Sequence, residues 1–205
     1  MSSVISYKPS ADEVKRLREE TDAGMIDCRN ALVRANGEYD AAKRELVELG
    51  QARAAKKNER TAREGLVGSY VHTGGKIGVL VEINCETDFV ARGPRFGDLV
   101  KDVAMHIAAM SPTYVSRDEV PATLVEAQRV ALREGIPADK KPEIVDKIVD
   151  GKLNKWFEEC VLLDQAFIKD DSQTIGELIG AAVGILGEKI AVRRFAKFVL
   201  GENEG

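Results

Sequence analysis

The chain has 205 residues, of which 44% are hydrophobic and 31% charged, with a formal net charge of -4 at pH 7. This length fits one or two domains, and the composition is typical of a folded, well-solvated protein. The acidic balance argues against a broad nucleic-acid-binding surface, so we expect no direct nucleic-acid partner. No apolar run approaches the ~20 residues that span a bilayer, and the N-terminus lacks a signal-peptide pattern. We therefore expect a cytoplasmic protein without membrane contact.

Residues 1–50 predict three short helices. They are expected to begin at a capping box formed by Ser10 and Glu13, at Met25 and at Tyr39, and Gly50 is expected to end the third. Helices of about ten residues are not stable alone, so they should pack together. The sequence therefore predicts a compact three-helix module of a size suited to recognition.

The next segment, residues 51–64, is rich in lysine and arginine and has almost no large apolar side chains. We interpret it as a basic linker that is helical or partly flexible. Its charges either face solvent or contact an acidic partner surface.

Residues 65–205 are predicted to form an α+β core. Alternating apolar residues from Leu66 to Thr73 and from Ile77 to Glu86 predict a β-hairpin, and residues 190–200 predict a final strand. The expected helices lie after Pro94, after a second capping box at Ser116 and Glu119, over 144–150, over 152–161 and over 174–186. Three strands with segregated helices imply a small antiparallel sheet.

Catalytic and metal-binding motifs are weak. Gly74-Gly75-Lys76 lacks the Ser or Thr of a phosphate-binding loop and lies between two strands, which favours a hairpin turn. Gly187-Glu188-Lys189 fails as such a loop because a glutamate separates the glycine from the lysine. His72 and His106 lack metal-ligand spacing, so we interpret them as helix-face or strand-surface histidines. We expect no enzyme activity, no cofactor and no metal site.

One loop, residues 84–92, puts a carboxylate and an aromatic ring side by side between the hairpin and the following helix. The residues themselves leave two interpretations open. Asp88 and Phe89 could insert into another protein. Alternatively, Asp88 caps a turn and Phe89 packs into the protein's own core.

Three separated motifs favour the first interpretation. LREETDAGMIDCRNAL (residues 17–32), EINCETDFVAR (82–92) and GEKIAVRRFAKFVLGE (187–202) resemble the elongation factor Ts family, in the same order. The resemblance extends from Ser10 to Glu202. It implies a guanine-nucleotide exchange factor for the GTPase elongation factor Tu. The resemblance also implies that the three-helix module of this chain is similar to ubiquitin-associated modules and docks on that GTPase.

The resemblance also assigns roles to residues. In this family a Thr-Asp-Phe-Val segment enters the GTPase near its bound magnesium ion, and positions in the N-terminal module dock on the nucleotide domain. Ile26 departs from the methionine common at its position, and it is stiffer at χ1. The intruding residues carried over are Thr87, Asp88, Phe89 and Val90, and the docking residues are Arg18, Met25 and Ile26.

Short members of the family pair the sheets of two copies, so the resemblance implies a homodimer. We expect the paired apolar face to be built near Val79, Val81 and Val192.

Two other classes of function remain possible on sequence grounds. An adaptor could use the three-helix module to bind ubiquitin-like or other partners, without any effect on nucleotide release. A thiol-dependent enzyme could use Cys28 or Cys85, although the sequence offers no evident base.

Overall fold

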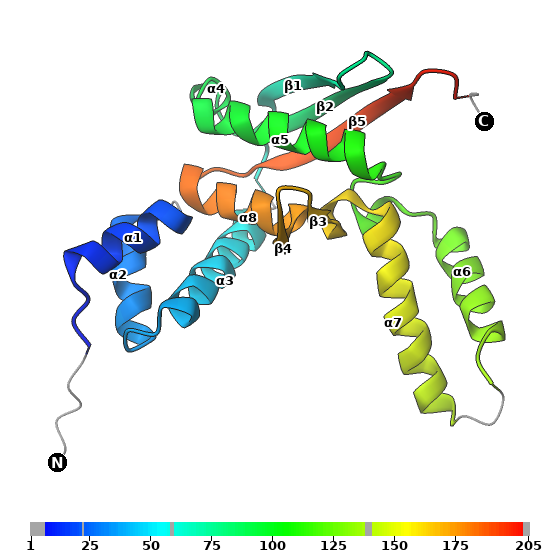
Figure 1. The fold of residues 1–205 in the computed structure, drawn as a ribbon, viewed down its shortest axis with the longest axis horizontal. Coiled ribbons are helices and arrows are strands. Elements are labelled where there is room, and N and C mark those ends of the chain that lie inside the picture. The colour runs from blue at the N-terminus through cyan, green and yellow to red at the C-terminus, as the bar shows by residue number, and fades with distance from the viewer. Residues whose placement is uncertain (1–6, 22, 58–59, 138–140, 203–205) are drawn as a thin grey trace. The chain divides into compact units, whose positions relative to one another are not determined.

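The computed structural model describes residues 7–21, 23–57, 60–137 and 141–202 (Figure 1). Its helices and small sheet confirm the α+β class. The chain forms two compact units, each assembled from separate segments. The first contains Met1–Gly65, Asn84–Phe96 and Glu177–Ala191, and the second contains Leu66–Ile83, Gly97–Gly176 and Val192–Gly205.

The first unit begins with the three predicted helices, α1 (Ala11–Thr21), α2 (Met25–Arg34) and α3 (Tyr39–Lys57). The capping box at the start of α1 is present. The Glu13 amide donates to Ser10 Oγ at 3.2 Å, and the Ser10 amide donates to Glu13 Oε2 at 2.7 Å. These bonds satisfy amides that the helix leaves without an internal partner.

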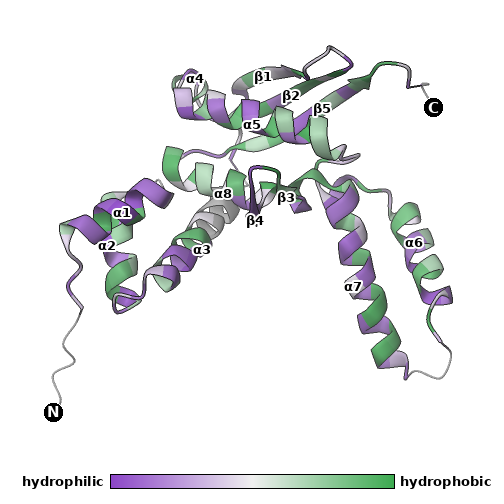
Figure 2. Ribbon diagram, in the orientation of Figure 1, coloured by the Kyte–Doolittle hydropathy of each residue, from purple (hydrophilic) through white to green (hydrophobic). Residues whose placement is uncertain are grey.

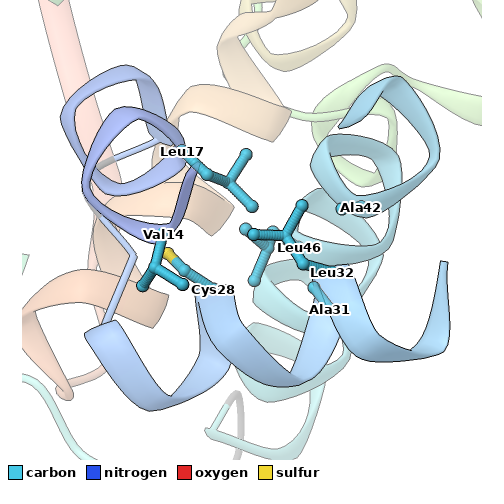
Figure 3. Close-up of a cluster of buried hydrophobic side chains, with 7 residues drawn as sticks. All are labelled: Val14, Leu17, Cys28, Ala31, Leu32, Ala42 and Leu46. Carbon is cyan, nitrogen blue, oxygen red and sulfur yellow. The ribbon is translucent and has the colours of Figure 1, made fainter. Parts of the chain in front are cut away.

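One buried cluster holds the three helices together (Figure 3). Each helix contributes from one face, as helical spacing of apolar residues requires. The cluster comprises Val14, Leu17, Cys28, Ala31, Leu32, Ala42 and Leu46. Because these contacts lie within the first fifty residues, the module has a core of its own.

Helix α3 does not end at Gly50, contrary to the prediction, but continues to Lys57. Gly50 is buried, and a Cβ there would lie 3.3 Å from the carbonyl oxygen of Gly180 in α8 (Ile175–Leu186). A Cβ on Gly184 would lie 3.5 Å from the Gly50 Cα. The glycine therefore permits close packing on α8, which is mostly hydrophobic (Figure 2), and this contact compensates for its poor helix propensity.

The larger sheet has the strand order β1-β2-β5, with β1 at Glu64–Val71, β2 at Ile77–Cys85 and β5 at Ala191–Val199. The predicted hairpin and final strand are thus confirmed. Gly74 and Gly75 have φ angles of +92° and +69°, a left-handed conformation that glycine adopts without strain. This confirms the hairpin turn.

Helix α5 (Pro94–Met110), which belongs to the second unit from Gly97 onward, covers one face of the sheet. Val79 and Val81 are buried on this face, and a Cβ on Gly68 would lie only 2.1 Å from Val100 Cγ1. The prediction that Val79 and Val81 form an exposed apolar face is therefore wrong. The predicted helix after Pro94 is confirmed, and its apolar side chains are buried except for the last one, Met110. The buried residues are Phe96, Leu99, Val100, Val103 and Ile107.

Helices α6 (Ala122–Glu134) and α7 (Pro142–Cys160) pair as a helical hairpin (Figure 1). Helix α7 is continuous through Gly151, where two separate helices were predicted. A Cβ at that position would meet nothing within 4 Å, so Gly151 interrupts the apolar pattern without a packing role.

The predicted capping box at Ser116 and Glu119 is absent. Ser116 precedes a short 3-10 turn, Arg117–Glu119, and its side chain makes no capping hydrogen bond. The Glu119 carboxylate instead accepts from the Val115 amide at 2.9 Å. The helix that follows begins at Ala122, and its N-cap is Pro121, whose side chain makes no capping hydrogen bond.

A second, two-stranded sheet of β3 (Ala166–Phe167) and β4 (Asp170–Thr174) follows the 3-10 turn Leu162–Asp164 and was not predicted. His106 is fully buried beneath it and is not a surface histidine. Its Nε2 lies 3.0 Å from Gln165 Oε1, and its Nδ1 accepts from the Ile168 amide at 3.3 Å. These partners fit the neutral ring.

Candidate functional site

The candidate site is the loop that leaves β2, and it contains a short helix, α4 (Asp88–Ala91). Thr87 is the N-cap of this helix. Its backbone is extended, and its Oγ1 accepts from the Val90 amide at 3.4 Å. A cap of this kind satisfies an amide that four helical residues cannot satisfy internally.

The two neighbours in the middle of α4 point in opposite directions. The Phe89 side chain is 84% exposed, whereas Val90 is buried together with Ala91. Asp88 is exposed and forms an i,i+4 ion pair with Arg92 at 3.0 Å. The interpretation that Phe89 packs into the protein's own core is therefore wrong. An aromatic ring and a carboxylate face outward, and Val90 anchors the turn from within.

The base of this loop is held by a carboxylate from a distant part of the sequence. Glu188 accepts from the Thr87 amide at 3.0 Å and from the Thr87 hydroxyl at 2.6 Å. Glu188 lies between α8 and β5, directly after Gly187, which has a φ of +75°. Both segments belong to the first unit.

Sequence reasoning did not identify Glu188 as part of the site. In the sequence, Glu188 is the glutamate that excludes a phosphate-binding loop, and it also lies in the family motif of residues 187–202, but neither pattern assigns it a contact. The residues around a single acidic side chain in a loop do not indicate which residue it will contact, and here that residue is 101 positions away. Only the three-dimensional arrangement brings the two loops together.

The predicted docking residues lie at the turn between α1 and α2. Arg18 is in the last turn of α1 and is exposed. Met25 and Ile26 open α2 with exposed fractions of 54% and 74%. Two adjacent apolar side chains left in solvent fit a contact surface for another protein.

The cysteines do not form a reactive site. Cys28 and Cys85 are buried, and burial raises the pKa of both thiols, which disfavours the nucleophilic thiolate. The described residues contain no cluster of three or more potential metal ligands. Across the same ranges, no helix has both the length and the apolar content needed to cross a membrane.

Comparisons with known proteins agree with the sequence motifs. The family described as elongation factor TS matches residues 36–202. The elongation factor Ts of an Anaeromyxobacter species is 54% identical, and the alignment covers 94% of this chain and 89% of that protein. Those of Citrifermentans bemidjiense and Caldanaerobacter subterraneus are 50% and 49% identical over 94% of this chain, covering 90% and 97% of their own lengths. The chain therefore belongs to the elongation factor Ts family.

Proposed function

We propose that this protein is a cytoplasmic guanine-nucleotide exchange factor that binds elongation factor Tu with its GDP and promotes GDP release during translation elongation. The observation that carries the proposal is the outward-facing pair Asp88 and Phe89, on a helix capped by Thr87 and anchored by Val90. The chain itself performs no chemical step in this proposal.

Exchange follows from a difference in affinity between two states of the GTPase. A factor that binds the nucleotide-free state more tightly than the GDP state weakens GDP binding by the same factor, because the two binding equilibria are linked. Equal affinity for both states would release nothing. The exchange activity must therefore reside in contacts made only when GDP is leaving.

Asp88 and Phe89 are suited to such contacts. A carboxylate brought near a bound magnesium ion competes for the metal and repels the phosphates that it holds. The aromatic ring is a wedge whose burial contributes about 1.5–3 kcal/mol. Reversing a 1:99 equilibrium requires about 5.5 kcal/mol, so the ring alone is insufficient and the magnesium and phosphate contacts must supply the rest.

The docking surface has a different role in the proposal. Arg18, Met25 and Ile26 contact the GTPase in both of its states, which raises overall affinity without favouring release. In this proposal the three-helix module binds the GTPase, and the loop that carries Asp88 and Phe89 then disturbs the nucleotide site of the GTPase.

The active form is proposed to be a homodimer that pairs the open face of the larger sheet. Residues on one face alternate along each strand, so the side chains opposite the buried Val79 and Val81 form this face. Its exposed apolar members are Val67, Val71, Leu80 and Phe198. A second copy covering these side chains would remove them from water.

Release of labelled GDP from purified elongation factor Tu tests the proposal. A substoichiometric amount of the protein should release GDP from an excess of elongation factor Tu, because each molecule dissociates from the GTPase after GTP has replaced GDP and can then act on another. The protein alone should hydrolyse neither GTP nor GDP. Binding without faster release would support the adaptor function instead and overturn the proposal.

A further inference from the structure

The loop that contains Thr87 and α4, here called the exchange loop, is joined to the loop between α8 and β5 by hydrogen bonds in both directions. Glu188 Oε2 accepts from the amides of Glu86, at 3.1 Å, and Thr87, at 3.0 Å. In return, Glu86 Oε1 accepts from the Lys189 amide at 2.6 Å. Each loop therefore supplies a carboxylate to the backbone of the other, and all of these residues belong to the first unit.

The basic segment before β1 closes the network. Lys189 Nζ donates to the Arg60 carbonyl oxygen at 2.9 Å, and the Arg60 guanidinium lies 3.4 Å from the Glu86 carboxylate. These outer contacts are exposed and weak. The inner contacts at Glu188 are charge-assisted, and two of them come from backbone amides whose direction is fixed.

Glu188 also sets the orientation of the cap of α4. The Thr87 hydroxyl donates its proton to Glu188 Oε1 at 2.6 Å, which leaves its oxygen lone pairs available to the Val90 amide. A hydroxyl has only one proton to donate, so this donation fixes the direction of the cap. A four-residue helix is not stable by itself, and the direction of Phe89 consequently depends on these contacts.

We propose that Glu188 is a positioning residue for nucleotide exchange. It holds Thr87 in the capping geometry, so that Asp88 and Phe89 face outward before the GTPase is met. An element that is already ordered loses less conformational entropy on binding. This inference rests on the proposed exchange function, because it assigns a role to Glu188 only through the loop that acts on the nucleotide site.

The first test is made on the free protein. Glu188→Ala should speed hydrogen exchange at the Glu86 and Thr87 amides, which lose their acceptor, while amides in α2 and α7 keep their protection. Glu126→Ala, which removes an exposed carboxylate from α6, serves as the control. Unchanged protection at Glu86 and Thr87 would overturn the inference without involving the GTPase.

The second test measures GDP release at saturating factor. Glu188→Ala should lower the maximal rate by about tenfold, since a loop that is no longer held must lose the conformational freedom of Asp88 and Phe89 when it enters the nucleotide site. Glu188→Gln, which retains one acceptor oxygen, should recover part of the rate. The concentration for half-maximal rate should change little, because Arg18, Met25 and Ile26 are untouched.

A mutant cycle separates positioning from a general loss of stability. If Glu188 acts through Asp88 and Phe89, then adding Glu188→Ala to the combined Asp88→Ala and Phe89→Ala variant should cause no further loss of rate. Multiplying losses would overturn the inference, as would a wild-type rate for Glu188→Ala. If the wild-type protein does not accelerate GDP release from elongation factor Tu, the proposed function fails. Hydrogen exchange in the same sample distinguishes this outcome from failure of the inference, because the Glu86 and Thr87 amides of the wild-type protein should still be protected.

Discussion

Removing the ring of Phe89 should separate exchange from stability. The side chain is 84% exposed, so Phe89→Ala should change the free energy of unfolding by no more than about 0.5 kcal/mol. A core phenylalanine would cost about 3–5 kcal/mol instead. In the complex, the same ring is proposed to be buried only while GDP leaves. Loss of about 1.5–3 kcal/mol there corresponds to a roughly 10- to 160-fold lower maximal rate of release.

The assay for this variant combines two measurements on one sample. Thermal unfolding reports the stability of the free protein, and stopped-flow release of labelled GDP at saturating factor reports the maximal rate. Val130→Ala is a matched control, because it removes an exposed apolar side chain from α6, outside the proposed interface. Unchanged stability with an unchanged maximal rate would remove Phe89 from the mechanism. A sharp fall in melting temperature would contradict its outward position.

Three further outcomes are expected. Met25→Ala should raise the factor concentration that gives half-maximal release while leaving the maximal rate unchanged; a lower maximal rate would refute its assignment to docking. Phe198→Asp should shift sedimentation equilibrium from dimer to monomer, and a persistent dimer would exclude the open sheet face as the interface. Burial lowers the pKa of His106 below its usual 6.5. The unfolded chain therefore binds a proton at this histidine more readily than the folded chain. As the pH is lowered through 6.5, the free energy of unfolding measured in urea should decrease, and it should decrease less in His106→Gln.

The sequence predicted the parts of the fold that local patterns encode. The capping box at Ser10 and Glu13 and the alternating strand after Gly75 appear as expected, because each depends on residues close together in the chain. The prediction that the third helix ends at Gly50 was wrong for a related reason. Glycine usually ends a helix, but here the close approach of α8 outweighs the local preference, and no sequence pattern announces a neighbour about 130 residues away.

The same distinction applies to the candidate site. Family motifs located Asp88 and Phe89, and the outward direction of Phe89 became known only from its exposure. Val90 was assigned to the intrusion with them, yet it is buried, so its part in any contact with the GTPase remains a prediction. Local sequence patterns also cannot show that Thr87 is fixed by Glu188, since this contact depends on tertiary structure.

The separation of 101 residues between Thr87 and Glu188 has a consequence for how the protein is made. The helices of the N-terminal module can pack as soon as the first fifty residues have been synthesised, because their core is local. At a synthesis rate of about 5–20 residues per second, the anchor of the exchange loop is added roughly 5–20 s after the loop itself. During this interval the nascent chain carries a formed docking module, while the loop still lacks the carboxylate that holds it.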